Sequence, residues 1–229
     1  LGQGQLSLAK YLFIANHFDD KSLNINKPKE FIKHMLERAD WRRDLHFHTS
    51  VTIDTLDYTG HGLNKGSKVV IAAAGDKIRD LTSTLSESLN LPTGFDKPRA
   101  VMDGVLAISA PNCNSKRGES DKRIKNFFKS FDKENPINKF PLIVLVDDSE
   151  FTSANIDNFL WVTFTRSNPA TDIYGIGSYT RYKHFGCEGS LVIDARVKPH
   201  HAPALEMNPA VEKRVMDMAA KGGALEGLF

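Results

Sequence analysis

Two adjacent carboxylates, Asp147 and Asp148, are the residues of this chain that first suggest chemistry. They follow the short unbroken apolar run 142–146, which is typical of a strand buried on both faces. Acidic strand ends bind a metal or polarise a water in nucleotide hydrolases, but that chemistry requires a glycine-rich phosphate loop ending in Lys-Ser or Lys-Thr. The segment Gly62 to Lys68 has glycines and lysines at the wrong spacing. We therefore predict that one of the two aspartates caps the helix that follows.

Histidines are the second group of candidate ligands. His46 and His48 lie two residues apart on a predicted strand, so their side chains share one face and could both reach a metal. No third ligand has an evident place, because the pair His200-His201 lies in a proline-flanked segment. Cys187 has no motif around it that would pair it with a histidine as a nucleophile. The residues alone thus predict neither a metal site nor a complete catalytic site.

The composition excludes several classes of protein. Of 229 residues 41% are hydrophobic, and 30 basic against 28 acidic side chains leave a net charge of +2, which gives no reason to expect nucleic acid or an anionic membrane as a partner. No apolar run approaches the roughly 18 residues of a membrane helix, and we expect no signal peptide. Two cysteines suit a reducing compartment, so we expect a cytoplasmic protein without a membrane span. The chain begins at Leu1 without an initiator methionine, and we expect it to be a piece of a longer protein.

The elements that must position these residues occur twice. Three residues of the first half recur 128 positions later: Phe31, Arg38 and Asp44 correspond to Phe159, Arg166 and Asp172, and Asp19-Asp20 corresponds in the same way to Asp147-Asp148. The pattern predicts an internal duplication of a β-α-β-turn-β unit of about 65 residues; coincidence between two generic α/β segments is the alternative. Within each copy, we expect Arg38 with Asp44, and Arg166 with Asp172, to form structural pairs that fix the end of the helix to the following strand.

The predicted fold class is α/β, with two pseudo-repeats of this unit forming one or more sheets flanked by helices, and a C-terminal helix after them. We divide the chain into a first α/β repeat (1–92), a connecting strand and amphipathic helix (93–139), a second α/β repeat (140–205), and a C-terminal helix with a tail (206–229). Strands are expected at 11–15, 45–51, 69–74, 104–110 and 142–146, and helices after Pro28, at 120–131, around Phe159 and after Asn208. Trp41 and Trp161 are expected in the core. The basic face of helix 120–131 is expected in solvent, with an anion-binding patch as the alternative.

Both halves resemble the UbiD-type decarboxylases. Those enzymes pair an apolar strand ending in Asp-Asp with a Trp-containing helix and a Thr-Arg-x-x-Pro-x-x-Asp ending, and here the strand 142–148 is followed by Trp161 and by Thr-Arg-Ser-Asn-Pro-Ala-Thr-Asp at 165–172. In the first half, Ile-Asp-Thr-Leu-Asp-Tyr at 53–58 stands where relatives have Pro-Ile-Asp-x-Leu-Asp, and Gly-Ser-Lys at 66–68 also matches. Trp41 stands where the family usually has proline, so that turn is expected to differ. The doubled pattern, with Ile-Asp-Ala-Arg-Val-Lys-Pro-His-His at 193–201, is most similar to the branch that acts in menaquinone synthesis through futalosine, on a naphthoate acid.

The resemblance implies a non-oxidative carboxy-lyase that uses prenylated FMN with a divalent metal (Mn) and K. In relatives the residues that hold the flavin phosphate and the metals, and the catalytic Glu-Arg-acid trio, lie upstream of the Gly-x-Gly segment that opens this chain. The resemblance therefore implies a C-terminal domain that has no catalytic residue and no metal site of its own. Its expected partners are the upstream flavin-binding domain and further copies in a homo-oligomer, and it should not be active alone.

Two stretches are expected, by resemblance, to touch the active site. Relatives place pocket-wall residues at the positions of Ile53, Asp54, Leu56 and Tyr58, and the hinge between domains near Gln3 and Gln5. Ordinary turn chemistry is the alternative for both stretches. Two other functions stay open at this point: a non-catalytic self-association or partner-binding module, and a metal-dependent hydrolase that uses Asp147, Asp148 and a histidine.

Overall fold

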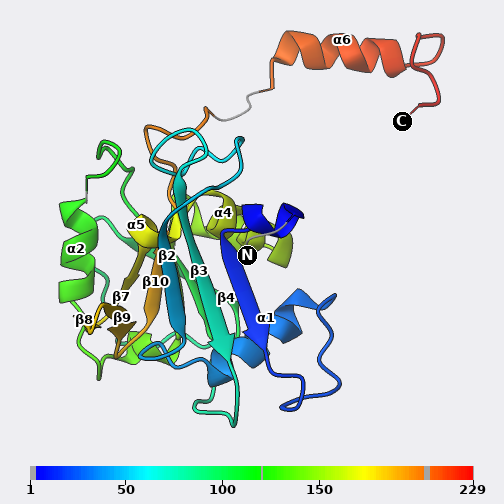
Figure 1. The fold of residues 1–229 in the computed structure, drawn as a ribbon. Coiled ribbons are helices and arrows are strands. Elements are labelled where there is room, and N and C mark those ends of the chain that lie inside the picture. Colours follow the sequence, from blue (N-terminus) through cyan, green and yellow to red (C-terminus); the bar gives the residue numbers. More distant parts are fainter. Residues whose placement is uncertain (1–3, 120, 204–206, 229) are drawn as a thin grey trace.

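The computed structural model describes residues 4–119, 121–203 and 207–228. It confirms the α/β class, with two β-sheets and a separate hairpin combined with helices (Figure 1). The strands are β1 (Tyr11–Ala15), β2 (Leu45–Val51), β3 (Gly66–Ala73), β4 (Asp96–Met102), β5 (Val105–Ser109), β6 (Leu142–Val146), β7 (Ile173–Gly175), β8 (Ser178–Arg181), β9 (His184–Cys187) and β10 (Leu191–Asp194). The helices are α1 (Pro28–Arg38), α2 (Lys122–Lys129), α3 (Ser149–Ser153), α4 (Ile156–Thr165), α5 (Pro169–Asp172) and α6 (Pro209–Ala219), with 3₁₀ helices η1 (Gly4–Leu8) and η2 (Pro136–Lys139).

The first sheet has the strand order β1-β3-β2. Its central strand, β3, pairs in parallel with β1 and antiparallel with β2. The apolar run 69–73 of β3 fits its central place, because Val69, Ile71 and Ala73 are all buried. β2 forms an edge of the sheet, so its outer backbone groups have no neighbouring strand.

The second sheet has the order β4-β5-β6-β10-β7. Every residue of β5, β6 and β10 is buried, and these three strands run parallel. β4 and β7 are antiparallel edge strands. The sequence predicted β5 and β6 but not β4, whose residues Asp96, Lys97 and Pro98 lack an apolar pattern. The connection between the repeats therefore adds two strands to the sheet of the second repeat.

The two repeats have the same topology. In both, the first and last strands are parallel neighbours, and the strand that follows the first one in sequence pairs antiparallel with the last one on its other side. The second repeat also contains the β8–β9 hairpin before its last strand. The registers correspond too, since Leu45 pairs with Ile71 as Ile173 pairs with Ile193. A serine at or just before the start of each last strand donates its backbone N–H and its hydroxyl to the side-chain amide oxygen of an asparagine: Ser67 to Asn168 at 3.0 and 2.7 Å, and Ser190 to Asn138 at 2.8 and 3.1 Å. These matches confirm the two pseudo-repeats, whereas the four boundaries drawn from the sequence stay predictions.

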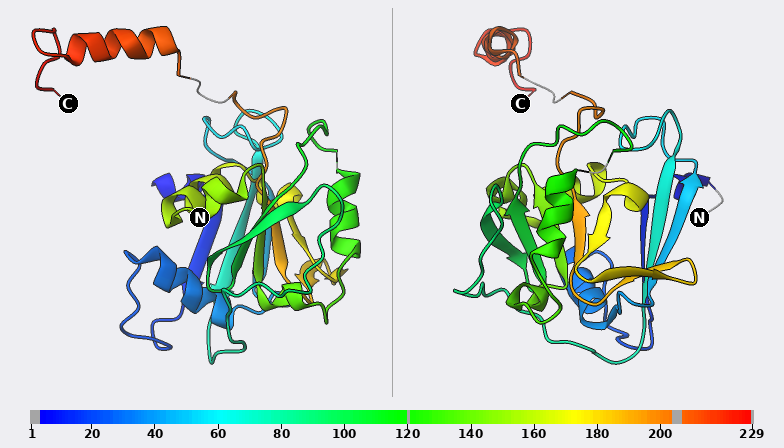
Figure 2. Two further views of the ribbon diagram at one scale, coloured as in Figure 1. Left: turned by 180° about the vertical axis from the view of Figure 1, so that it is seen from behind. Right: turned by 90° about the vertical axis from the view of Figure 1, so that its left-hand side faces the viewer.

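The hydrophobic core lies on both faces of the second sheet. One cluster joins that sheet to the first sheet and includes apolar side chains of α1 and α4, such as Met35 and Phe159. The other cluster packs the opposite face of the second sheet against α2, through Ile124, Phe127 and Phe131. The views in Figure 2 show α2 on the outer side of this sheet. Both sheets thus share one core, and the loops at their ends are held by it.

Two expectations about apolar side chains have different outcomes. Trp41 is buried and donates its indole N–H to the Pro141 carbonyl at 2.9 Å, as expected for a core residue. Trp161 is 63% exposed, so its predicted place in the core is wrong. The reason is its position on α4, between the buried residues Phe159 and Val162 but on the outward side of the helix.

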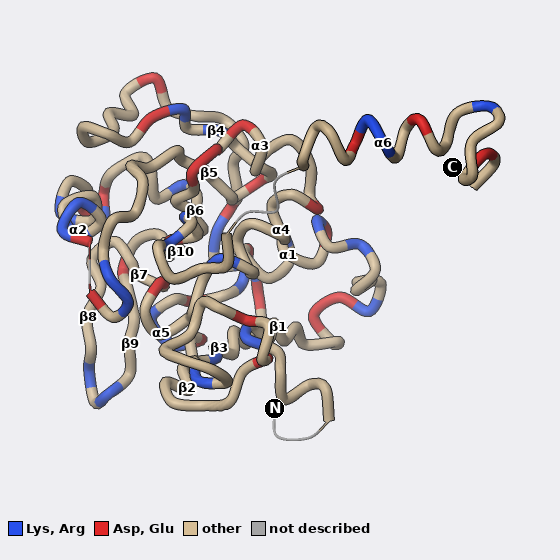
Figure 3. Tube along the Cα trace, turned by 90° about the horizontal axis from the view of Figure 1, so that it is seen from above, with Lys and Arg blue, Asp and Glu red and all other residues tan. Residues whose placement is uncertain are grey.

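The helix α6 extends away from the rest of the molecule in every view (Figures 1 and 2). It begins as predicted, with Asn208 capping and Pro209 in the first turn, but none of its residues is buried. Its apolar side chains, among them Val211 and Val215, lie exposed. Charges of both signs are interspersed along the whole trace (Figure 3). No helix within the described ranges is both long enough and apolar enough to cross a membrane.

Candidate functional site

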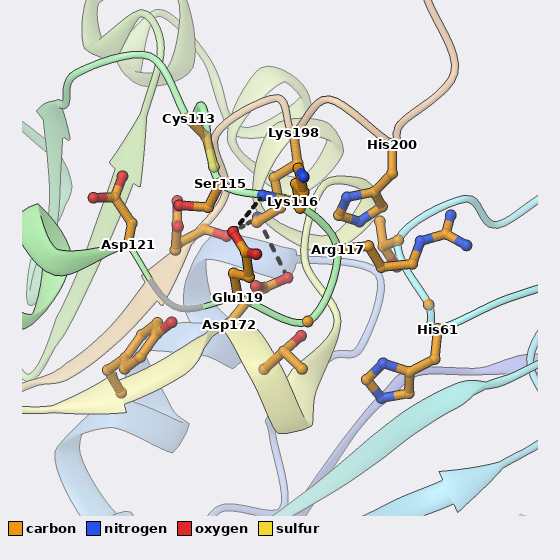
Figure 4. Close-up of a pocket in the computed structure, with 16 residues that line it drawn as sticks. His61, Cys113, Ser115, Lys116, Arg117, Glu119, Asp121, Asp172, Lys198 and His200 are labelled. Atoms are coloured by element: carbon orange, nitrogen blue, oxygen red, sulfur yellow. Dashed lines mark hydrogen bonds and ion pairs between the residues drawn. The ribbon is translucent and has the colours of Figure 1, made fainter.

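A cavity of about 220 Å³ lies where loops of both repeats meet (Figure 4). Its walls come from the loop that follows β2, the loop that follows β5, the end of α5 with the start of β7, and the end of β10 with the segment after it. The lining residues are Thr59, Gly60, His61, Cys113, Ser115, Lys116, Arg117, Gly118, Glu119, Asp121, Thr171, Asp172, Tyr174, Asp194, Lys198 and His200. These loops follow the carboxyl ends of β5 and β10, the edge at which α/β sheets place ligands.

A buried ion pair forms the centre of this cavity. The Lys198 ammonium lies 3.3 Å from a carboxylate oxygen of Asp172 and donates to the Asp194 carbonyl at 2.9 Å. Asp172 also accepts the Asn168 backbone N–H at 2.7 Å. Both side chains are almost wholly removed from solvent. Burial raises the pKa of Asp172 to about 6, although Lys198 lowers it, so this carboxyl can hold a proton near neutral pH.

A second buried network supports the wall formed by β10. Arg196 donates to both carboxylate oxygens of Asp194 at 2.8 Å and lies 3.2 Å from a carboxylate oxygen of Asp121. Burial alone would raise the pKa of Asp121, but hydrogen bonds from Arg123 and Arg196 outweigh burial and lower it to about 2. The same competition lowers the pKa of Asp194. These two aspartates therefore stay charged and fix the position of the segment after β10.

His200 and His201, both neutral, lie in the segment that follows β10. The Nδ1 atom of His201 accepts the Lys198 backbone N–H at 3.3 Å, while its Nε2 atom is buried without a partner among the described residues. Burial, together with the nearby Lys198, lowers the pKa of His201 to about 3. Burial and the neighbouring Arg117 lower the pKa of His200 as well, and its Nδ1 atom is likewise buried without a partner in the described part. Neither imidazole is therefore a cation at neutral pH.

The first repeat contributes a second buried ion pair, next to the cavity. The Lys10 ammonium lies 2.7 Å from a carboxylate oxygen of Asp57, and it donates to the Thr59 hydroxyl at 3.0 Å and to the Ser167 carbonyl at 2.8 Å. Burial lowers the pKa of Lys10 despite its carboxylate partner. Because Ser167 belongs to the second repeat and Thr59 lines the cavity, Lys10 connects the two halves directly at the site.

The pocket-wall residues expected from the resemblance lie beside the cavity rather than in it. Ile53 is 1% exposed and packs under the loop, whereas Leu56 and Tyr58 are 80% and 52% exposed. Asp54 accepts the Leu56 N–H at 2.8 Å, which is ordinary turn chemistry. The residues of this loop that line the cavity are the next three, 59–61. Gln5 is exposed on η1, and Gln3 lies outside the described residues.

The predicted arginine–aspartate pairs are wrong in both repeats. Arg38 lies 3.2 Å from Glu37 and donates to the Gly75 carbonyl, while Asp44 pairs with Arg43 at 2.6 Å. In the second repeat Arg166 pairs with Asp147, and Asp172 pairs with Lys198, at 3.2 and 3.3 Å. Asp44 and Asp172 nevertheless hold the turn between helix and strand, through backbone N–H groups rather than through Arg38 and Arg166.

The two aspartates after β6 have separate structural roles. Asp148 caps α3 by accepting the backbone N–H groups of Glu150 and Phe151, which is the role predicted for one of the pair. Asp147 accepts the Val197 N–H at 2.8 Å. Asp19, its counterpart in the first repeat, accepts the Gly75 N–H at 2.7 Å in the same way. Each thereby attaches the loop that leaves the last strand of its repeat.

No group of three metal-ligating side chains exists within the described ranges of the chain. His46 and His48 both line a groove beside β2, and neither has a carboxylate beside it there. The cavity of about 220 Å³ is also smaller than the roughly 300–1,000 Å³ of most cofactor pockets. This cavity therefore offers neither a set of ligands for a divalent metal nor the volume of most cofactor pockets.

The sequence missed the side chains that matter most in this cavity. The loop 113–119 has no hydrophobic period and is simply polar, and Lys198 resembles any solvated lysine. The one available signal was the excess of charged residues in a segment, 194–201, that directly follows a buried strand. Charges placed so close to a buried strand require partners, because unpaired burial is costly.

Comparison with known proteins finds one matching family model and several similar proteins. The family model described as 3-octaprenyl-4-hydroxybenzoate carboxy-lyase C-terminal domain, UbiD_C, matches residues 1–73. The match covers about the first third of the chain. The expected resemblance to that family is confirmed for this part, and the menaquinone branch stays a prediction.

Similar proteins cover nearly the whole of this chain. A protein of Chlamydia pneumoniae that is named as a subunit of 4-hydroxybenzoate decarboxylase is 33% identical over 95% of the chain, and an uncharacterized protein of Chlamydia muridarum is 32% identical over 94%. In both cases the match covers 34% of the relative, so the chain spans about a third of the length of the curated relatives it matches. Two structures of the vanillic acid decarboxylase of Sedimentibacter hydroxybenzoicus in open form overlap 76% of the chain, and 44% and 45% of their own chains, at 12% identity with TM-scores of 0.32 and 0.33.

Proposed function

We propose that this chain is the C-terminal part of a UbiD-like carboxy-lyase that removes CO₂ from an aromatic or unsaturated acid. One observation carries the proposal: UbiD_C matches residues 1–73, and a relative named as a decarboxylase subunit is 33% identical over 95% of the chain. The structure adds that the second repeat, which the family model does not reach, has the topology of the first. A quinone-biosynthetic substrate, such as a naphthoate acid of menaquinone synthesis, is the finer form of the same proposal.

The prenylated FMN, its divalent metal and K⁺ would be held by the remaining two thirds of such a protein. This division is supported by the absence of a three-ligand metal group in the described residues and by the small volume of the cavity. When bound, the flavin supplies the electron sink for loss of CO₂. The chain described here would supply shape, exclusion of water and contact surface.

The contact surface has two parts. The exposed Leu56 and Tyr58 lie on one loop of the body, beside the cavity. The exposed apolar residues of α6, such as Val211 and Val215, lie on a helix with no buried residue of its own. Apolar side chains on an isolated helix are stabilised only when another surface covers them. We assign the loop to the flavin domain and α6 to a neighbouring copy in a homo-oligomer.

Two proteins test the proposal together: the 229-residue chain and a longer form extended upstream by roughly one domain. Each is titrated with prenylated FMN and Mn²⁺, and CO₂ release is measured with 4-hydroxybenzoate and a hydroxynaphthoic acid. We expect flavin uptake and CO₂ release by the longer form only. Stoichiometric flavin uptake by the short chain would contradict the division of the site. Uptake by neither protein would favour a non-catalytic self-association or partner-binding module.

A further inference from the structure

One face of the first sheet has no helix of the described residues lying over it (Figures 1 and 2). Successive side chains of a strand point to opposite faces of its sheet. In β1, Tyr11 and Phe13 pack against Phe164 in the core cluster that the two sheets share, so Leu12 and Ile14 point away from that core. Leu12 is partly buried and Ile14 is 45% exposed. The outer side of β1 is therefore apolar and open.

The central strand β3 continues this face. The odd-numbered residues of 69–73 point into the shared core, so Val70 and Ala72 point outward, and both are only partly buried. The parallel register places Val70 beside Leu12 and Ala72 beside Ile14. We call these four side chains the open face, and neither core cluster includes any of them.

In the second repeat, a helix covers the corresponding face. The register that the repeats share equates Ile71 of β3 with Ile193 of β10. On that basis the open face corresponds to Ile143, Leu145, Val192 and Asp194. The three apolar members of that set are 0% exposed and belong to the cluster that packs against α2. An amphipathic helix thus completes this side of the second sheet, and the first sheet has the same side without one.

The helix α6 has the surface that such a face requires. Val211, Val215 and Met218 recur at helical spacing on one side of it, with Lys213 and Asp217 on the opposite side. None of its residues is buried, and it extends away from its own open face in both figures. Its 11 residues span about 16 Å, which matches the length of the five-residue strand β1.

We propose that α6 of a second copy of this chain covers the open face, with the stripe of Val211, Val215 and Met218 packed on Leu12 and Ile14. Each copy has one such helix and one such face, so two copies close around a two-fold axis by exchanging their helices. The inference rests on the assignment of α6 to a neighbouring copy, made as part of the proposed function, and it names the surface that receives the helix. It does not depend on the decarboxylase chemistry.

Cross-linking of mixed chains tests which surfaces meet. In a Cys113→Ser background, one full-length chain carries Ile14→Cys and the other carries Val215→Cys, and the mixture is treated with a short bismaleimide. The remaining thiol, Cys187, is 1% exposed and should not react. We expect a covalent dimer whose linked peptides, identified by mass spectrometry, come one from each chain. Trp161→Cys, an exposed position outside the open face, replaces Ile14→Cys in the control and should give no such dimer.

Sedimentation measures how much the contact contributes to self-association. Ile14→Glu places a charge in the apolar contact and should weaken self-association at least about tenfold, while Trp161→Glu should leave it unchanged. Val215→Glu should have the same effect as Ile14→Glu, and it cannot disturb the body of the molecule because α6 has no buried residue. This second variant keeps the test decisive if Ile14→Glu fails to fold.

Three results would overturn the proposal. The first is a wild-type chain that stays monomeric. The second is a link between Ile14→Cys and Val215→Cys that forms only when one chain carries both, because α6 then covers its own sheet. The third is weaker self-association with Ile14→Glu but not with Val215→Glu, because the open face then meets another part of the partner. A longer form that releases no CO₂ but gives the mixed cross-link would contradict the proposed function and support this inference.

Discussion

Asp44 and Asp172 occupy the same place in the two repeats. Each accepts the backbone N–H of the residue four positions before it, Asp40 at 2.8 Å and Asn168 at 2.7 Å, and each thereby closes the turn between helix and strand. Their charged partners differ, because Asp44 pairs with the exposed Arg43 while Asp172 is buried against Lys198. The same turn is thus closed in the same way in both repeats, and of these two aspartates Asp172 is the one that lines the cavity of about 220 Å³.

The shared hydrogen bond should be measurable in the first repeat. Asp44→Ala removes the acceptor of the Asp40 N–H, and we expect a loss of about 1–2 kcal/mol in the free energy of unfolding. Asp44→Asn keeps an oxygen acceptor at the same place and should lose less. Urea unfolding of both variants measures the two losses in the free energy of unfolding. An equal loss for the two variants would mean that the carboxylate acts through its charge and not through this hydrogen bond.

The raised pKa of Asp172 predicts a pH dependence of stability. Because burial raises this pKa from 3.8 to about 6, the contribution of Asp172 is fully present below about pH 4 and is lost as the pH rises through about 6. The loss amounts to about 3 kcal/mol at most. Asp172→Asn cannot titrate, so the difference in unfolding free energy between wild type and variant should shift against the wild type between pH 4 and pH 7. Parallel pH profiles of the two proteins would contradict this assignment.

The buried arginine network should be far more sensitive than the surface pair. Arg196→Met leaves Asp194 buried without its bidentate partner, and we expect a loss of about 3–5 kcal/mol. Arg166→Met breaks a pair whose side chains are 31% and 29% exposed, and should cost less than about 1 kcal/mol. Thermal and urea unfolding of both variants give the comparison. Similar losses in the two would show that Arg196 is not held as tightly as its contacts indicate.

Two substitutions in the loop after β2 should have different effects, one on stability and the other on activity. Ile53→Ala opens space under the loop and should reduce the unfolding free energy by about 2–4 kcal/mol. Leu56→Ala changes an exposed side chain and should leave stability within about 0.5 kcal/mol. In the longer form of the protein, we expect Leu56→Ala to lower CO₂ release. Unchanged CO₂ release would remove Leu56 from the contact with the flavin domain.

The helix α6 should matter for assembly and not for folding. A chain ending at Pro203 lacks a helix with no buried residue, so its Tm should stay within about 1 °C of that of the full chain. We expect the truncated chain to sediment as a smaller species. In the full-length chain, Val211→Asp combined with Val215→Asp should have the same effect, while Lys213→Gln should not. A lower Tm on truncation would place α6 against its own domain.

Periodicity and turn chemistry predicted much of the fold. The strands 11–15, 45–51 and 142–146 have the bounds that their apolar patterns indicated, and the doubled spacing around Asp44 and Asp172 reflects a real doubling of topology. These features depend on local sequence and on burial, both of which leave a pattern in the chain. The sequence of β4 shows no such pattern, because β4 is a strand through its pairing with β5 and not through the apolar pattern of its own residues.

Side-chain partners were predicted less well than elements. Arg166 was expected on Asp172, but the end of β6 brings Asp147 to it and the segment after β10 brings Lys198 to Asp172. Such partners come from 19 or more positions away and depend on how loops pack, which residue spacing within one repeat does not contain. The cavity was missed for the same reason, since its walls come from four separate segments.

The indole of Trp41 has a consequence for how the molecule unfolds. It links the turn between α1 and β2 to Pro141, at the start of the second repeat. Lys10, directly before β1, donates to the Ser167 carbonyl in the same way. With the core cluster that both sheets share, these links make the two copies one cooperative unit. A peptide of residues 1–73 would expose the faces that the second copy covers, so each copy depends on the other for its stability, and the chain should melt in a single transition.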